Sequence, residues 1–496
     1  MPSPYPRIVV AVLLCGSLPA CNFSPDDRPP KIDIPASYKE ADTRQPAQPT
    51  QAAVDSARGP WWEHFGDRVL SSLETRIENA NPDLAAAVAR YDQARALAAE
   101  AAAGLMPQIV AEGSLSDNKQ SLNRPLRILP SKQPTYYGAN QLGASVGYEV
   151  DFWGRIRNQA AAGTASAQAS AADLATMRLS LQAELATIYF QLRGLDDQMA
   201  VLDDSIAAYQ KARDLTQRLF DARLIPRMDV FRARTQLEDA RAQSAAIAAR
   251  RAMTEHAIAV LTGTAASSFS LPPATQISAP PAVPAGLPST LLQRRPDIAA
   301  AAHRITAAAK VVGTAKAAFF PSLTLGVVGG FQSAQIDMLS VHNTLWSLGP
   351  KVTLPLFEGG RLNAQKSAAY AQLHEAEANY RSIVLAAVRD VEDALAELRW
   401  LEQEAAARNA SAEDARRTFD AAMTLYRQGA DSYLNVVTAQ ASLLQEQQSQ
   451  RDIRMRQLLA NVSLIKALGG GWEAKANCSS HVMTISLVRH AIPCPL

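Results

Sequence analysis

The sequence predicts a mixed, mainly α-helical chain built as a tandem repeat, with two strands and one long helical hairpin in each half. Three observations support this fold class. Short motifs recur in the same order about two hundred positions apart, four stretches alternate between apolar and polar residues, and two alanine-rich stretches run for more than sixty residues with almost no glycine or proline. Helical patterns of that length need a bundle or coiled-coil partner, because no globular core is so deep.

Composition narrows the possible functions. The chain has 496 residues, of which 48% are hydrophobic but only 6% aromatic, so much of its apolar content is alanine. Alanine is the strongest helix former, and its small side chain lets helices approach closely. The formal net charge is +2, from 49 basic and 47 acidic residues. This balance argues against nucleic acid as a partner, since a nucleic-acid-binding face would be basic.

The N-terminus resembles an export signal. Arg7 precedes a short apolar run, and the stretch "SLPAC" ends at Cys21. The run is too short to span a bilayer. We therefore predict a signal peptide over 1–20 and a lipid-anchored segment over 21–60, with Cys21 carrying the lipid. The alternative is an ordinary signal cut near Ala20, which leaves Cys21 a plain thiol. By analogy with lipoprotein sorting, Asn22 favours the outer membrane and contact with its lipid.

Internal repetition defines the predicted domains. "NPDLAAAVARYDQARA" near the start of one half matches "RPDIAAAAHRITAAAK" in the other. Matched positions are 214 apart in the first part of each half (Pro82 with Pro296, Pro107 with Pro321) and 206 apart afterwards (Gly154 with Gly360). We predict a first structural repeat over 61–270, a proline-rich linker over 271–290, a second structural repeat over 291–472 and a C-terminal tail over 473–496.

Each half begins with a predicted helix. Asn81 suits the N-cap, Pro82 the first helical position, and Asp83 the positive end of the helix dipole. Pro296 and Asp297 repeat the last two features.

Two strands follow in each half. The alternating stretches run from Leu142 to Phe152, from Ser322 to Val327 and from Trp346 to Phe357, and a fourth opens after Pro107. Such alternation gives one apolar and one polar face. No stretch elsewhere is apolar enough for a membrane-spanning helix. If the chain crosses a membrane, its four strands must join those of other copies, because small membrane barrels need about eight strands and a trimer would supply about twelve.

Two long helical hairpins complete the prediction. Helices are expected over Arg155–Ala222 and Arg361–Gln428, followed by returning helices over Pro226–Leu261 and Ala430–Leu468. At 1.5 Å per residue, each long helix would extend roughly 100 Å. The short turns before Pro226 and before Ser432 make both hairpins antiparallel.

The transition from sheet to helix is predicted at two Gly-Arg pairs, Gly154-Arg155 and Gly360-Arg361. Glycine permits the bend, because it adopts backbone conformations that other residues avoid. Two interpretations of the arginines stay open: contact with lipid headgroups at the membrane rim, or plain exposure to solvent.

The chain resembles the TolC/NodT-type outer-membrane efflux channel family over about Trp61 to Trp472. The motifs that carry the resemblance, in order, are "GPWWEHFGD", "DFWGR", "PAGLPSTLLQRRPDIAAA", "LPLFEGGR", "YRQGADSYLNVVTAQ" and "KALGGGW". The resemblance implies a homotrimeric outer-membrane β-barrel, with four strands per chain, continued by a long periplasmic α-helical barrel. It also implies a passive channel for small molecules and drugs, working with a periplasmic membrane-fusion adaptor and a proton-driven inner-membrane pump of the resistance-nodulation-division type.

The resemblance places the adaptor contacts and the gate at the hairpin tips. The residues that match the family pattern there are Leu224, Tyr426, Gly429 and Leu434. The family usually has glycine where Arg223 stands, so one adaptor contact is expected to differ there. The family often has an acidic residue and an arginine where Thr438 and Ala441 stand, so a salt-bridge lock at that ring of the helical barrel should be weaker. Asp229, Arg232 and Asp431 are alternative tip charges, or ordinary solvated helix charges.

Other functions find less support. The chain has no GxxxxGK[ST] phosphate loop, and "HEAEA" at His374 lacks the second histidine of a zinc motif, so we expect neither an enzyme nor a cofactor. Two alternatives remain: a type I protein-secretion channel, and a structural coiled-coil lipoprotein of the envelope. In the tail, Cys478 and Cys494 are either a disulfide or two free thiols.

Overall fold

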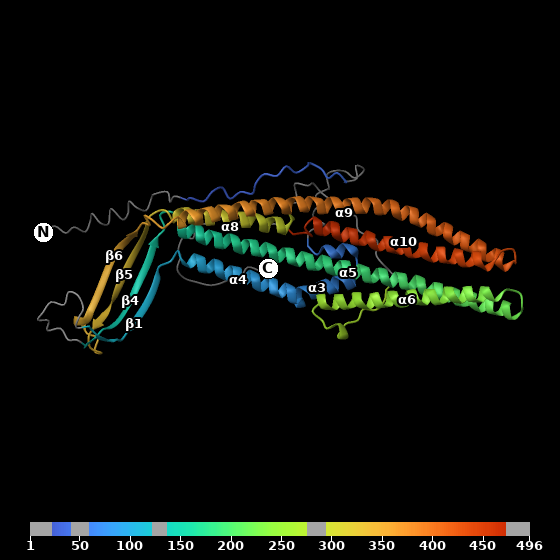
Figure 1. Cartoon of the computed structure of the whole chain (residues 1–496), viewed down its shortest axis with the longest axis horizontal. Coiled ribbons are helices and arrows are strands. Elements are labelled where there is room, and N and C mark those ends of the chain that lie inside the picture. Colours follow the sequence, from blue (N-terminus) through green and yellow to red (C-terminus); the bar gives the residue numbers. More distant parts are fainter. Residues whose placement is uncertain (1–21, 41–58, 122–135, 275–293, 473–496) are drawn as a thin grey trace.

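The computed structural model describes residues 22–40, 59–121, 136–274 and 294–472. The molecule is elongated, with a β-sheet at one end and two long helical hairpins that extend away from it (Figure 1). The predicted signal peptide, Cys21, most of the proline-rich linker and the tail with Cys478 and Cys494 lie outside the described residues.

The main sheet has four antiparallel strands in the order β1-β4-β5-β6. Their bounds are Gln108–Ser114 (β1), Asn140–Val150 (β4), Ser322–Ser333 (β5) and Thr344–Thr353 (β6). A small second sheet pairs β2 (Asp117–Lys119) with β3 (Tyr136–Gly138). The pairing of β4 with β5 joins the two halves of the chain, from Asn140 opposite Ser333 to Val150 opposite Leu323.

Two predicted strand ends are wrong. β4 ends at Val150 rather than at Phe152. The alternating pattern suggested a strand up to Phe357, but β6 ends at Thr353. Its partner β5 begins at Ser322, directly opposite Thr353, so the residues after Thr353 have no strand to pair with in the described part of the chain. Pro355 also lacks the N–H that a ladder requires.

The apolar face of the sheet is not covered within the described chain. Trp346, Leu348 and Val352 share one face of β6, and their exposed fractions are 81%, 69% and 67%. Exposed apolar surface of this extent marks a face that contacts something other than water.

The long helices match the predicted hairpins. α5 (Arg155–Asp221) and α9 (Arg361–Arg427) have 67 residues each, and α6 (Arg227–Leu261) and α10 (Tyr433–Ala467) have 35 each. The predicted start of α10 at Ala430 is wrong by three residues, because Ser432 takes an extended N-cap conformation. Among the described helices, none combines the length and the apolar character that crossing a bilayer requires.

Shorter helices pack along the sheet-proximal part of the long ones. α4 (Pro82–Ala103) lies along α5, and α8 (Pro296–Ala317) packs against both α5 and α9 (Figure 1). The predicted cap of α4 is confirmed, because the Asn81 side chain accepts a hydrogen bond from the Leu84 N–H at 2.8 Å. Arg295 occupies the same position before α8 without a side-chain cap bond.

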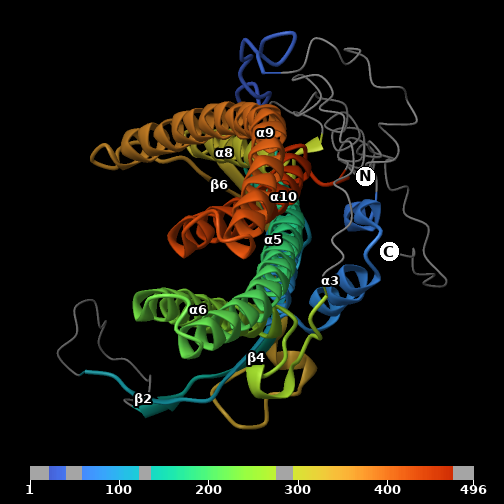
Figure 2. The same cartoon turned by 90° about the vertical axis from the view of Figure 1, so that its right-hand side faces the viewer.

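Two further segments lie on the outside of the helices (Figure 2). α3 (Arg68–Ala80) and the 3-10 helix η2 (Trp61–Phe65) cover the middle of α5, where Trp61 and Phe65 enter a core with Tyr189 and Phe190. Residues 22–40 run along α8 and α9: the Ser24 hydroxyl donates to the Ala309 carbonyl at 3.2 Å.

Candidate functional site

Each of the two Gly-Arg pairs lies at the start of a long helix. Gly154 and Gly360 take left-handed conformations with φ of 76° and 87°, immediately before α5 and α9. The first junction contacts the other half of the chain at the point where α8 leads into β5, because the Trp153 indole N–H donates to the Pro321 carbonyl at 2.8 Å. The Trp153 ring also stacks on Phe320, with 4.8 Å between centroids.

Both junction arginines are paired. Arg155 donates two hydrogen bonds to Glu149, from Nε at 2.9 Å and from Nη2 at 2.6 Å. This pairing raises the pKa of Arg155 further above its usual value. Arg361 contacts Glu358 and Gln365. Both side chains keep partial exposure, so the interpretation as headgroup contacts stays a prediction.

The hairpin tips are built from two closely similar turns. In the first, the Arg223 N–H donates to the Phe220 carbonyl and the Leu224 N–H to the Leu219 carbonyl. In the second, Gly429 and Ala430 make the same two bonds with residues of α9. This is the hydrogen-bond pattern of a Schellman helix end. It leaves the Leu224 side chain 71% exposed at the end of the molecule.

Of the predicted tip charges, two pair with each other. Asp229 and Arg232, one turn apart on α6, form an ion pair at 3.1 Å. Asp431 instead accepts from the Ser432 N–H and from the Asn435 side chain, both at 2.7 Å. Asp431 therefore stabilises the start of α10, where Leu434 is exposed. None of these contacts tests a gating role, which remains a prediction.

An aromatic pair connects the two helices of the second hairpin near its tip. The rings of Tyr426 and Tyr433 lie 5.2 Å apart, and Tyr433 is buried. Burial, and then the charge of Asp229, raises the pKa of Tyr426. The Tyr426 hydroxyl is buried and has no hydrogen-bond partner within the described chain. Ala233 of α6 joins the same apolar cluster, so the two hairpins touch at their tips.

Sequence reasoning missed Tyr433 and a groove beside this pair. The groove, of about 600 Å³, lies between the ends of α5 and α9 and is lined by Lys211, Arg218, Asp420 and Tyr426 among others. The second tyrosine seven positions after Tyr426 was the available signal, because both flank the turn.

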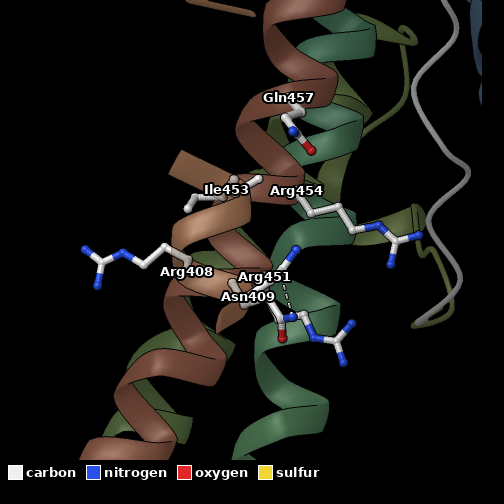
Figure 3. Close-up of a pocket in the computed structure, with 8 residues that line it drawn as sticks. Arg408, Asn409, Arg451, Ile453, Arg454 and Gln457 are labelled. Atoms are coloured by element: carbon white, nitrogen blue, oxygen red, sulfur yellow. Dashed lines mark hydrogen bonds between the residues drawn. The ribbon is translucent and has the colours of Figure 1, made fainter. Parts of the chain in front are cut away.

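A second groove lies between α9 and α10, nearer the middle of the hairpin (Figure 3). Its volume is about 370 Å³, and Gln450 donates to Asn409 across it at 2.7 Å. Arg408 points away from Arg451 and Arg454 (Figure 3), and pairs with Glu446 at 3.3 Å. Burial raises the pKa of Asp197 on α5, and the charges of Arg451 and Arg454 oppose that rise.

Within the described residues, no group of three or more histidine, cysteine or acidic side chains is placed to hold a metal ion. The described residues instead form a long helical body, with an apolar sheet at one end and the two hairpin turns at the other.

The comparisons with known proteins identify this arrangement. The family described as outer membrane efflux protein matches the chain twice, over residues 75–264 and 287–470. The chain belongs to the outer membrane efflux protein family. The resemblance seen in the sequence is therefore confirmed, and so is the expectation of an outer-membrane efflux protein. The family is one of channel proteins rather than enzymes.

Individual relatives agree. The pyoverdine export outer membrane protein OpmQ of Pseudomonas putida is 32% identical over 95% of this chain and 98% of its own length. The toluene efflux pump outer membrane protein TtgF of Pseudomonas putida is 30% identical over 98% of this chain and 99% of its own. The solved outer-membrane channel OprN has a TM-score of 0.83 at 28% identity, and covers 91% of this chain and 100% of that one.

Proposed function

We propose that three copies of this chain close a passive conduit that carries small molecules out through the outer membrane. In this proposal each copy is a tandem repeat that contributes four strands to a shared twelve-stranded barrel. The hairpins form a helical barrel beneath it. The domains follow the predicted boundaries, and Cys21 carries a lipid anchor.

The uncovered sheet supports this proposal most directly. Its apolar face is exposed, and β1 and β6 are edges without a neighbouring strand in the described chain. In lipid, unpaired backbone groups at an edge cost several kcal/mol each, so a membrane sheet must close on itself. Four strands are too few to close, and cyclic symmetry is the usual way for copies to complete one.

The energy for transport would come from partners. The chain contains no phosphate loop, and its relatives are named as outer membrane components of efflux pumps. We propose that a periplasmic membrane-fusion adaptor contacts the tips at Leu224, Gly429 and Leu434, and that a proton-driven inner-membrane pump loads the conduit.

The tips are also the proposed gate. The apolar contact between the hairpins holds the turns together. Tyr426, whose buried hydroxyl has no hydrogen-bond partner among the described residues, is the weak point of this contact. A buried polar group without a partner costs about 1–3 kcal/mol. Opening would expose this hydroxyl to water and recover part of that cost.

Single-channel conductance in planar bilayers tests the proposal. The wild-type protein should give small, brief openings. Gly429→Ala and Asp431→Ala, which disturb the turn and the start of α10, should give larger and longer ones. Asp203→Ala, an exposed change in the middle of α5, is the matched control and should behave as wild type. A folded oligomer that never conducts, in any variant, would overturn the conduit and favour a structural lipoprotein.

A further inference from the structure

Two lysines lie at the seam between α8 and α9, close to the sheet. The Lys316 Nζ atom is 5.4 Å from the centre of the Tyr370 ring, and the Lys366 Nζ atom is 5.3 Å from the centre of the Phe319 ring. Lys316 and Phe319 are one turn apart on α8, and Lys366 and Tyr370 are one turn apart on α9. The two contacts therefore cross the seam in opposite directions, which places the two ammonium groups near each other.

Neither lysine has a carboxylate partner within the described residues. Both are half-buried, and the contacts of their side chains in this part of the chain are with the two aromatic rings. Lys310, six positions before Lys316 on α8, instead pairs with Asp27 at 2.8 Å. Two like charges at neighbouring positions repel each other. An anion that contacted both ammonium groups would remove this repulsion, so the pair is a candidate anion site.

The arginines of the nearby junctions already contact carboxylates. Arg155 donates to both carboxyl oxygens of Glu149, and Arg361 pairs with Glu358. The positive charge of each arginine is therefore balanced within the chain. The two lysines are the better candidates for contact with an external anion at this end of the helices.

The lysine pair lies on the outer side of the helical body. Ala309, Lys316 and Phe320 recur on α8 at the spacing of one helix face. Ser24 shows the direction of this face, because its hydroxyl donates to the Ala309 carbonyl. Residues 22–40, to which Ser24 belongs, run along the outside of the helices (Figure 2). Lys316 therefore lies on the outer face as well.

Aromatic side chains mark the level of this pair along the molecule. The Phe320 ring stacks on those of Phe23 and Trp153, with centroid distances of 4.7 Å and 4.8 Å. β5 starts at Ser322, two residues after Phe320. Aromatic residues are enriched where a membrane protein passes from hydrocarbon to water. In the proposed barrel the apolar sheet lies in the hydrocarbon, so the lysine pair lies at the level of the lipid headgroups.

We propose that Lys316 and Lys366 together bind the phosphate group of an anionic phospholipid in the leaflet nearer the helical body. This inference rests on the proposed barrel and deepens it by naming a lipid contact. Each ammonium group can donate up to three hydrogen bonds, and bonds to a charged phosphate are roughly twice as strong as those between neutral groups. Phe320, which is 36% exposed, contacts the start of the acyl chains.

The site prefers an anionic lipid to a zwitterionic one. A zwitterionic headgroup brings its own cation close to the phosphate, and two lysines repel that cation. The headgroup of phosphatidylglycerol carries no cation, so its phosphate can balance the charge of the pair. Basic pockets beside membrane-embedded segments bind anionic headgroups for the same reason.

The lipid dependence of stability tests the site in the full-length oligomer. In neutral detergent, phosphatidylglycerol should raise the temperature at which the wild-type oligomer dissociates, at concentrations where phosphatidylcholine has little effect. Lys316→Gln combined with Lys366→Gln should need on the order of thirtyfold more phosphatidylglycerol for the same rise, because each basic residue near an anionic lipid surface typically contributes about fivefold.

Two double variants control for charge and for folding. Lys316→Arg with Lys366→Arg keeps both positive charges and should respond as wild type. Lys211→Gln with Arg416→Gln removes two exposed cations nearer the hairpin tips, and it should also respond as wild type. Because each protein is compared with itself in phosphatidylcholine, a general loss of stability does not change the result.

Inorganic phosphate distinguishes a lipid headgroup from a free ion. Added at the same concentrations as phosphatidylglycerol, it should leave the dissociation temperature unchanged. An equal rise with inorganic phosphate or with phosphatidylcholine, or an unchanged response in the double glutamine variant, would overturn the lipid site and leave the shared barrel standing. A wild-type protein that is monomeric in membranes would instead overturn the proposed function.

Discussion

Arg223 and Gly429 adopt the same left-handed backbone conformation, with φ of 62° and 71°, one residue beyond the C-cap of each of the two longest helices. Arg223 is the one residue other than glycine with positive φ in the described part of the chain. The left-handed conformation costs a residue with a Cβ roughly 1–2 kcal/mol. The first tip therefore stores strain that the second avoids.

Replacing Arg223 by glycine should stabilise the protein by about 1 kcal/mol, because glycine meets no steric penalty at this φ. The midpoint of denaturant unfolding in detergent would report the change. Gly429→Ala should move the midpoint in the opposite direction by a similar amount. If Arg223→Gly lowered the midpoint, contacts of the arginine side chain would outweigh the strain.

Gly263→Ala should cost more than about 2 kcal/mol, on the scale of local strain at such positions. Two effects combine there: φ is 65°, and an added Cβ would meet the backbone of Ala80. Gly59→Ala is the matched control, because its φ is 83° but no atom of the described residues lies within 4 Å of its Cβ position. Thermal unfolding of both variants separates the cost of backbone strain from the cost of the collision. Equal losses of stability would show that the surrounding structure shifts and relieves the collision.

Asp196 should be among the most sensitive charged residues. It is buried and accepts hydrogen bonds from Arg193 at 2.9 Å, Arg251 at 2.6 Å and the Ala274 N–H at 3.1 Å. Asp196→Ala leaves two arginines without their shared acceptor, and removing one member of a buried pair typically costs about 3–5 kcal/mol.

The Asp196 variant should also release the segment that follows α6, because Arg251 and Arg193 hold its Leu271 and Pro272 carbonyls. Limited proteolysis near residue 274 would therefore become faster. Asp203→Ala, an exposed acid on the same helix, should change neither stability nor cleavage. Unchanged cleavage in Asp196→Ala would show that the segment is held by other contacts.

Glu74 makes stability depend on pH. It is buried on α3 with both carboxyl oxygens lacking a hydrogen-bond partner in the described chain. Burial, and then the charge of Glu78, raises its pKa from 4.5 to about 9. The folded state therefore keeps its proton while the unfolded state loses it, so stability is full below about pH 4.5 and falls as pH rises towards 9.

Glu74→Gln should remove this loss, which is at most about 1.4 kcal/mol per pH unit within that window. Unfolding midpoints of wild type and variant, measured at about pH 5 and pH 8, give the test, and the variant should gain most at the higher pH. Glu184→Gln, which removes an exposed carboxylate from α5, is the matched control and should leave the pH profile unchanged. Parallel pH profiles for wild type and Glu74→Gln would contradict the assignment.

Much of the fold was predictable because its signals are local. Asn81 and Pro82 mark a helix start by their own chemistry, and Gly154 and Gly360 mark bends that favour glycine. Long stretches with almost no proline or glycine predicted the bounds of the hairpin helices nearly to the residue. The end of β6 was not predictable from alternation, because it depends on where β5 begins to pair with it.

The contacts that depend on distant residues escaped sequence reasoning. Asp196 contacts its partners only because the segment after α6 packs back against α5. The local sequence pattern does not predict that packing. Tyr433 was missed although it is only seven positions after Tyr426, because the two rings meet only when the turn brings α10 back against α9. Arg223 corresponds to Gly429 under the repeat offset of 206 positions, which indicated a position that favours glycine. This correspondence alone did not give the backbone angle.

The packing of residues 22–40 has a consequence for the order of folding. The Lys39 N–H donates to Glu392 at 2.8 Å, and Ser24 reaches Ala309 on α8. The partners of this early segment are therefore more than 280 positions later in the chain. Contacts between distant positions form slowly, because a long loop must close first. The first described residues to emerge during synthesis are thus among the last to dock, after the second hairpin has presented its surface.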